Sequence, residues 1–121
     1  MDADKGSVTL RWEQVVVDAL DPVALGTWWA EVLGWTIVND SPGEFEIQSE
    51  PGVLPGIIFE PVTAPKTEKN RVHLDFRPTD QTAAADLLEA HGARRVDIGQ
   101  GDQQWIVYAD PEGNEFCLLH H

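Results

Sequence analysis

The chain has 121 residues, the length of one domain, and its 21 Asp and Glu against eight Lys and Arg give a net charge of −13 at pH 7. This charge argues against a nucleic-acid partner or an anionic membrane surface, because both are bound mainly through cationic side chains. The single cysteine, Cys117, excludes an intrachain disulfide. The amino terminus is acidic and polar, unlike a signal peptide. We therefore expect a cytoplasmic protein.

The first half of the chain predicts a strand, a helix and three further strands. Residues 8–19 are rich in β-branched side chains, which is typical of a strand. Asp21 is the expected N-cap of the helix, Pro22 its first residue and Gly34 its end. The three strands that follow are expected over residues 35–39, 44–49 and 56–61.

The second half repeats this order after a polar connector, residues 62–70. A strand is predicted over residues 72–77, and a helix from the cap Asp80 to Gly92. Three strands complete the pattern, over residues 94–98, 104–109 and 115–119. Because the caps and the helix-ending glycines recur at a near-constant offset, we expect a single domain, 1–121, built from two βαβββ modules. Module one covers about 8–61 and module two about 71–119.

Side chains alternate between the two faces of a strand, and this places four polar residues on one side of the predicted sheet. The first strand of each module has one uniformly apolar face, which we expect to pack under the helices. The opposite faces carry Gln14 in module one and His73 at the equivalent position in module two. Glu60 and Cys117 correspond in the last strand of each module. We therefore expect these four side chains to converge on one concave surface.

Other residues are candidates for the wall of that cavity. Trp12 and Trp105 are expected to line it, since aromatic faces bind flat or apolar ligands. Glu60 lies either at an exposed rim or beside a cation such as Arg71 or Arg77, because an unpaired buried carboxylate is costly. Arg77 is also a candidate ligand-binding residue. Cys117 is most simply a small buried apolar side chain, although with His73 it could hold zinc.

Short motifs in both halves carry a resemblance to a known family. They are Val17-Asp18-Ala19-Leu20-Asp21-Pro22 with Trp28-Trp29 and Leu33-Gly34-Trp35, then Lys69-Asn70-Arg71-Val72-His73-Leu74-Asp75, and Asp110-Pro111-Glu112-Gly113-Asn114-Glu115-Phe116-Cys117. With these motifs the sequence resembles the vicinal oxygen chelate superfamily, which includes glyoxalase I, ring-cleaving dioxygenases and bleomycin-resistance proteins. It looks most like short glyoxalase-like proteins of actinobacteria. The resemblance implies an α+β fold whose modules form a curved, cup-like mixed sheet with the helices on its outer face.

The resemblance also implies where a site would lie. Metal-using members take ligands from the first and last strands of each module, which makes Gln14, Glu60 and His73 candidate ligands of a divalent metal. Cys117 stands where glyoxalase-type enzymes usually carry a glutamate that is both ligand and base. This departure favours a protein without a cofactor that binds a small, partly apolar molecule, as in drug sequestration or resistance. The alternative is a metal-dependent lyase, isomerase or dioxygenase acting on a vicinal-oxygen substrate. Short members often form dimers, so a homodimer is also implied.

Overall fold

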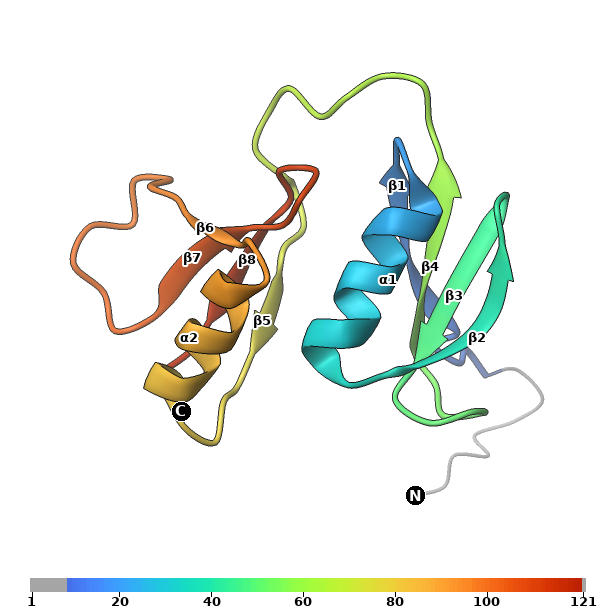
Figure 1. The fold of residues 1–121 in the computed structure, drawn as a ribbon, viewed down its shortest axis with the longest axis horizontal. Coiled ribbons are helices and arrows are strands. Elements are labelled where there is room, and N and C mark those ends of the chain that lie inside the picture. The colour runs from blue at the N-terminus through green and yellow to red at the C-terminus, as the bar shows by residue number, and fades with distance from the viewer. Residues whose placement is uncertain (1–8, 121) are drawn as a thin grey trace.

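The computed structural model describes residues 9–120, which form two modules with the same order of elements (Figure 1). The first module consists of β1 (Gln14–Ala19), α1 (Pro22–Leu33), β2 (Thr36–Ser41), β3 (Glu44–Gln48) and β4 (Gly56–Pro61). The second module consists of β5 (Leu74–Phe76), α2 (Gln81–Ala90), β6 (Arg94–Arg95), β7 (Ile106–Ala109) and β8 (Glu115–Leu118). The predicted α+β class with two βαβββ modules is confirmed.

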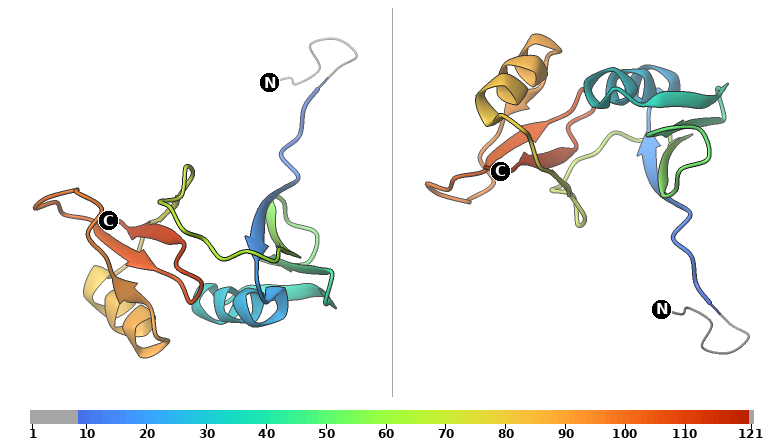
Figure 2. Two further views of the ribbon diagram at one scale, coloured as in Figure 1. Left: turned by 90° about the horizontal axis from the view of Figure 1, so that it is seen from above. Right: turned by 90° about the horizontal axis from the view of Figure 1, so that it is seen from below.

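Each module forms its own four-stranded mixed sheet. The strand orders are β1-β4-β3-β2 and β5-β8-β7-β6. In both sheets the first strand of the module pairs parallel with the last, and the other pairs are antiparallel. Both sheets are open, and both helices lie on the same side of them (Figure 2). The opposite side of each sheet, called the concave face below, carries no helix of the described chain.

The helices begin at the predicted caps. The Ala24 N–H donates to Asp21 Oδ1 at 3.0 Å, and the Ala83 N–H donates to Asp80 Oδ1 at 3.1 Å. The first helix ends at Gly34, whose φ of 68° lies in the left-handed region that favours glycine. Among the residues that the structure describes, no helix is both long enough and apolar enough to cross a membrane.

One hydrophobic core includes residues of both modules. The apolar faces of β1 and β5 pack against it, as predicted, through Val15, Val17, Leu74 and Phe76. The aromatic side chains of this core are Trp29, Phe45, Phe59, Tyr108 and Phe116. Helix α1 approaches the first sheet closely at Gly26, where a Cβ would overlap the Phe45 ring. Because residues of both modules share this core, the modules are packed together rather than independent.

Helix α1 connects the first module to the loop between β7 and β8. Trp29 lies edge-on to Phe116, with 4.8 Å between ring centroids, and its indole N–H donates to Asp110 Oδ2 at 3.0 Å. Asp110 is 2% exposed and also accepts hydrogen bonds from the backbone N–H groups of Glu112 and Asn114. The loop between β7 and β8 therefore also anchors α1.

Several strands are shorter than predicted, because a strand persists only where a ladder partner exists. The strand expected over residues 8–19 begins at Gln14, which lies opposite Gly56, the first residue of β4; residue 8 is outside the described residues. The strand expected over residues 94–98 is reduced to the two residues of β6, which pair with the end of β7.

Candidate functional site

A cleft of about 690 Å³ lies between the two modules. It is bordered by β1 and β4, by β5 and the start of β8, by Trp29 and by the connector. Most of its lining is apolar, and this part comprises Val15, Val16, Val17, Trp29, Ile57, Phe59, Val62, Ala64, Pro65, Val72, Leu74 and Phe116. Ligand pockets of drug-sized molecules have about 300–1,000 Å³ and a mainly apolar lining. The cleft has the size and surface of such a pocket.

The connector is fixed at the edge of the cleft by Glu115. Its carboxylate accepts hydrogen bonds from Lys66 Nζ at 2.8 Å and from the Asn70 N–H at 2.7 Å, and the Glu115 N–H donates to Asn70 Oδ1 at 2.9 Å. Burial of Glu115 would raise its pKa, but the hydrogen bonds from Lys66 and Asn70 outweigh burial and hold the pKa below its ordinary value. The Glu115 carboxylate is therefore occupied by hydrogen bonds within its own chain, and these bonds hold the connector at the edge of the cleft.

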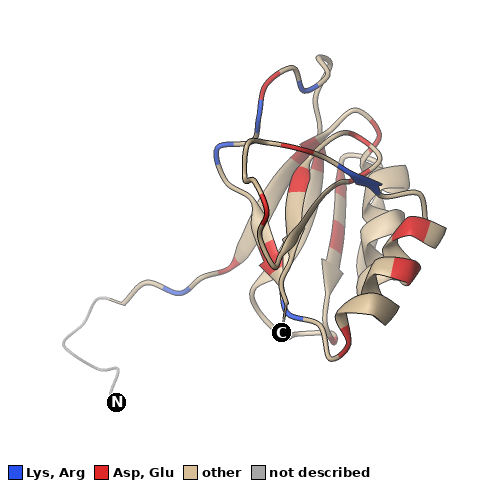
Figure 3. Ribbon diagram, turned by 90° about the vertical axis from the view of Figure 1, so that its left-hand side faces the viewer, with Lys and Arg blue, Asp and Glu red and all other residues tan. Residues whose placement is uncertain are grey.

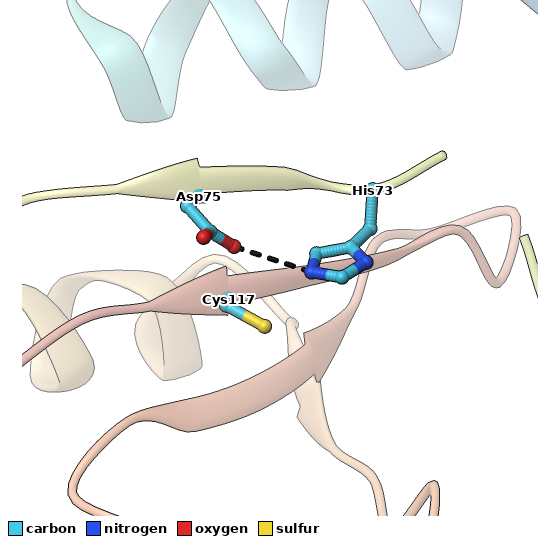
Figure 4. Close-up of side chains that lie close together, drawn as sticks. All are labelled: His73, Asp75 and Cys117. Carbon is cyan, nitrogen blue, oxygen red and sulfur yellow. Dashed lines mark ion pairs between the residues drawn. The ribbon is translucent and has the colours of Figure 1, made fainter. Parts of the chain in front are cut away.

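Three possible metal ligands meet on the concave face of the second sheet (Figure 4). They are His73, just before β5, Asp75 in β5, and Cys117, which lies opposite Asp75 in β8. Their ligand atoms all lie within 4.8 Å of one another, and His73 Nε2 is 3.3 Å from Asp75 Oδ1. The imidazole and the carboxylate are partly exposed, whereas the thiol is buried.

The donor set of this cluster fits a zinc-like ion, because imidazole, thiolate and carboxylate all bind zinc. Burial raises the pKa of the Cys117 thiol to about 11, and the neighbouring Asp75 adds to the shift. The thiol is thus protonated at neutral pH, and a metal must displace its proton to bind.

The structure brings two of the four predicted ligand positions together, His73 and Cys117. Gln14 and Glu60 are half-buried in the other sheet, at opposite ends of the β1–β4 ladder. Glu60 is not part of the three-residue cluster, and no ion pair within residues 9–120 includes it. Asp75 was not predicted as a ligand, although its alternation with His73 in the sequence places it on the same face.

The predicted aromatic residues lie away from the lining of the cleft. Trp12 precedes β1 and is 67% exposed, and Trp105 precedes β7 and is 38% exposed. The rings that line the cleft belong to Trp29, Phe59 and Phe116. Arg77 lines a second, smaller pocket. Trp29 is also a member of the hydrophobic core.

The sequence matches the glyoxalase-like domain family over residues 14–119, nearly the whole fold described above. The chain belongs to this family, within the vicinal oxygen chelate superfamily. No curated protein matches this glyoxalase-like protein by sequence.

Solved structures share the fold at low sequence identity. A bleomycin resistance determinant encoded on transposon Tn5 is 15% identical, with a TM-score of 0.61 over 93% of this chain and 98% of that chain. The trypanothione-dependent glyoxalase I of Leishmania major is 14% identical, with a TM-score of 0.68 over 92% and 86%. TnmS3, an antibiotic-binding protein from a Streptomyces species, is 16% identical, with a TM-score of 0.62 over 94% and 98%. At such identities the likeness shows the fold alone.

Proposed function

We propose that this glyoxalase-like protein is a cytoplasmic binder of a small, partly apolar molecule, with sequestration of a drug as its role. The observation that carries the proposal is the cleft of about 690 Å³ between the modules, with its largely apolar lining. The neighbours described as an antibiotic-binding protein and as a bleomycin resistance determinant support the same class of function. The free thiol of Cys117 suits a reducing compartment.

Some polar groups that line the cleft are already hydrogen-bonded within the chain, and others can still bind a ligand. Asp110 and Glu115 are bound to their own chain, as described above. The indole N–H of Trp29 is likewise used by Asp110, so Trp29 presents only apolar surface to a ligand. Asp18 lines the cleft with an exposed side chain that belongs to no ion pair within residues 9–120, so it can orient a bound molecule. His73 also lines the cleft, but its Nε2 is 3.3 Å from Asp75 Oδ1.

Binding is tested with 1-anilinonaphthalene-8-sulfonate, an aromatic dye with one sulfonate group whose emission rises when its rings bind an apolar surface. We expect saturable binding of one dye per chain and a higher melting temperature, because a ligand of the folded state stabilises it. Val72 lines the cleft yet is 76% exposed, so Val72→Gln changes the lining without disturbing the core. This substitution should weaken dye binding several-fold.

The matched control is Val53→Gln, because Val53 is 46% exposed in the β3–β4 loop and does not line the cleft. This control should bind the dye like the parent protein. Dye binding that does not saturate, or that both variants weaken equally, would contradict the proposed site. Aromatic antibiotics are then ranked by displacement of the dye.

We further propose a homodimer in which the concave face of the first sheet meets that of the second sheet in a partner copy. Asp18 and Glu60 lie directly opposite each other in the first sheet, an unfavourable arrangement of like charges. No ion pair within residues 9–120 compensates either of them. In such a dimer Gln14 and Glu60 of one copy would face the His73 and Cys117 cluster of the other.

A metal-dependent lyase, isomerase or dioxygenase is the second candidate function, favoured by the cluster of His73, Asp75 and Cys117. Three protein ligands leave a coordination position for a substrate or water. The binding proposal predicts clearly less than one equivalent of divalent metal per chain in protein purified without chelators. A stoichiometric ion that is lost in His73→Ala, and retained in the control His91→Ala, would favour the enzyme instead.

A further inference from the structure

A second pocket of about 220 Å³ lies between the two helices, on the side of the sheets opposite the concave faces. Val32 and Leu33 of α1 form one wall, and Ala84, Leu87 and Leu88 of α2 form the other. Its aromatic lining residues are Trp29, Phe76 and Phe116, and Pro78, Cys117 and Leu118 also line it. An apolar cavity of about 150 Å³ is large enough for a benzene ring. The α1–α2 pocket therefore has room for one ring with a small substituent.

Arg77 is the charged residue of this lining. It follows β5 directly, is exposed, and takes part in no ion pair within residues 9–120. A guanidinium binds a carboxylate through two parallel hydrogen bonds. The pocket thus combines an apolar cavity large enough for one aromatic ring with one cationic side chain, Arg77.

The α1–α2 pocket and the cleft share a wall. Trp29 and Phe116 line both, and their ring centroids are 4.8 Å apart in an edge-to-face arrangement. A molecule in the α1–α2 pocket would therefore contact Trp29 and Phe116, which also line the cleft. We propose that this pocket is a binding site for a small aromatic monocarboxylate, with its ring between α1 and α2 and its carboxylate on Arg77. This site is separate from the cleft and does not depend on the function proposed for it.

Benzoate is the probe, and benzamide is its neutral counterpart of the same shape. We expect benzoate to bind the full chain with one site, to change tryptophan emission, and to raise the melting temperature. Arg77→Gln should weaken benzoate binding at least tenfold and leave the weaker binding of benzamide within twofold. Arg94→Gln is the matched control, because Arg94 is also exposed and outside the ion pairs of the described chain.

A second variant fills the pocket from α2. Ala84→Leu keeps good helix propensity and adds bulk to the lining, so it should abolish benzoate binding and leave dye binding in the cleft unchanged. Benzoate that fails to saturate the protein at about 10 mM would overturn the proposal, as would equal losses in Arg77→Gln and Arg94→Gln. Equal affinities for benzoate and benzamide would also overturn it. Should Ala84→Leu impair folding, the exposed Arg77→Gln still decides between these outcomes.

Discussion

At the scale of single residues, Cys117 shows how a neighbouring strand alters a side chain. Asp75 lies opposite it in the parallel β5–β8 pair, and together with burial this carboxylate raises the pKa of the thiol to about 11. In an unfolded chain the pKa of cysteine is about 8.5. The folded state therefore keeps the thiol proton at pH values where the unfolded state loses it.

This difference predicts a loss of stability at high pH. A pKa that is raised on folding contributes stability that is fully present below the pKa of the unfolded chain, and that stability is lost as pH rises through the folded-state pKa. Between about pH 8 and pH 10.5 the free energy of unfolding of the parent protein should fall on the order of 1 kcal/mol more than that of Cys117→Ala. Urea denaturation of the parent protein and of Cys117→Ala at both pH values measures this difference in the free energy of unfolding. Because every other titratable side chain is the same in both proteins, parallel pH dependences would show that the thiol is not shifted.

At the scale of elements, Asp110 connects the β7–β8 loop to α1. Its buried carboxylate accepts hydrogen bonds from Trp29, from two backbone N–H groups and from the Asn114 amide. Removing it leaves several buried donors without an acceptor, and each unsatisfied donor costs about 1–3 kcal/mol.

We expect Asp110→Ala to lower the free energy of unfolding by about 3 kcal/mol and to shift the tryptophan emission, since Trp29 loses its acceptor. Asp102→Ala, at an exposed position in the β6–β7 loop, is the control and should change stability by less than about 0.5 kcal/mol. Chemical denaturation followed by fluorescence measures both quantities. A small effect of Asp110→Ala would mean that α1 is held by its apolar contacts alone.

The elements were largely predictable from the sequence, because they depend on local signals. Asp21, Pro22 and Gly34 mark the ends of α1 without reference to the rest of the chain, and alternation identified the apolar faces of β1 and β5. Strand ends were less predictable, since they depend on ladder partners. The two residues of β6 show this most clearly.

The cleft was less predictable than the fold, because its walls come from both modules. Trp29 lies on a helix of the first module and reaches Phe116 of the second, a contact that no periodicity indicates. Lys66 joins the site through Glu115, which lies far along the chain. The sequence could place His73 near Cys117, because β5 and β8 are paired and both side chains lie on the same face of the sheet.

At the scale of the whole molecule, charge is distributed unevenly between the modules. From Gln14 to Pro61 the sequence contains no Lys, Arg or His, whereas eight Asp and Glu fall in that range. The basic side chains of the described residues follow in the connector and the second module, apart from Arg11, and Figure 3 shows basic segments on the connector and on β6. The first module from Gln14 to Pro61 is therefore purely acidic, whereas residues 62–119 combine six Lys and Arg with ten Asp and Glu.

This asymmetry gives a direct test of the proposed homodimer. Two copies related by a two-fold axis would make the contact between the first sheet and the partner's second module twice, with Asp18 and Glu60 in each contact. Light scattering at micromolar concentration should give about twice the mass of one chain. Replacing both Asp18 and Glu60 by Lys should raise the dissociation constant at least tenfold. The control replaces Glu31 of α1 and Asp86 of α2, both exposed, by Lys and should leave the dimer intact. A mass of one chain at every concentration tested would exclude this dimer.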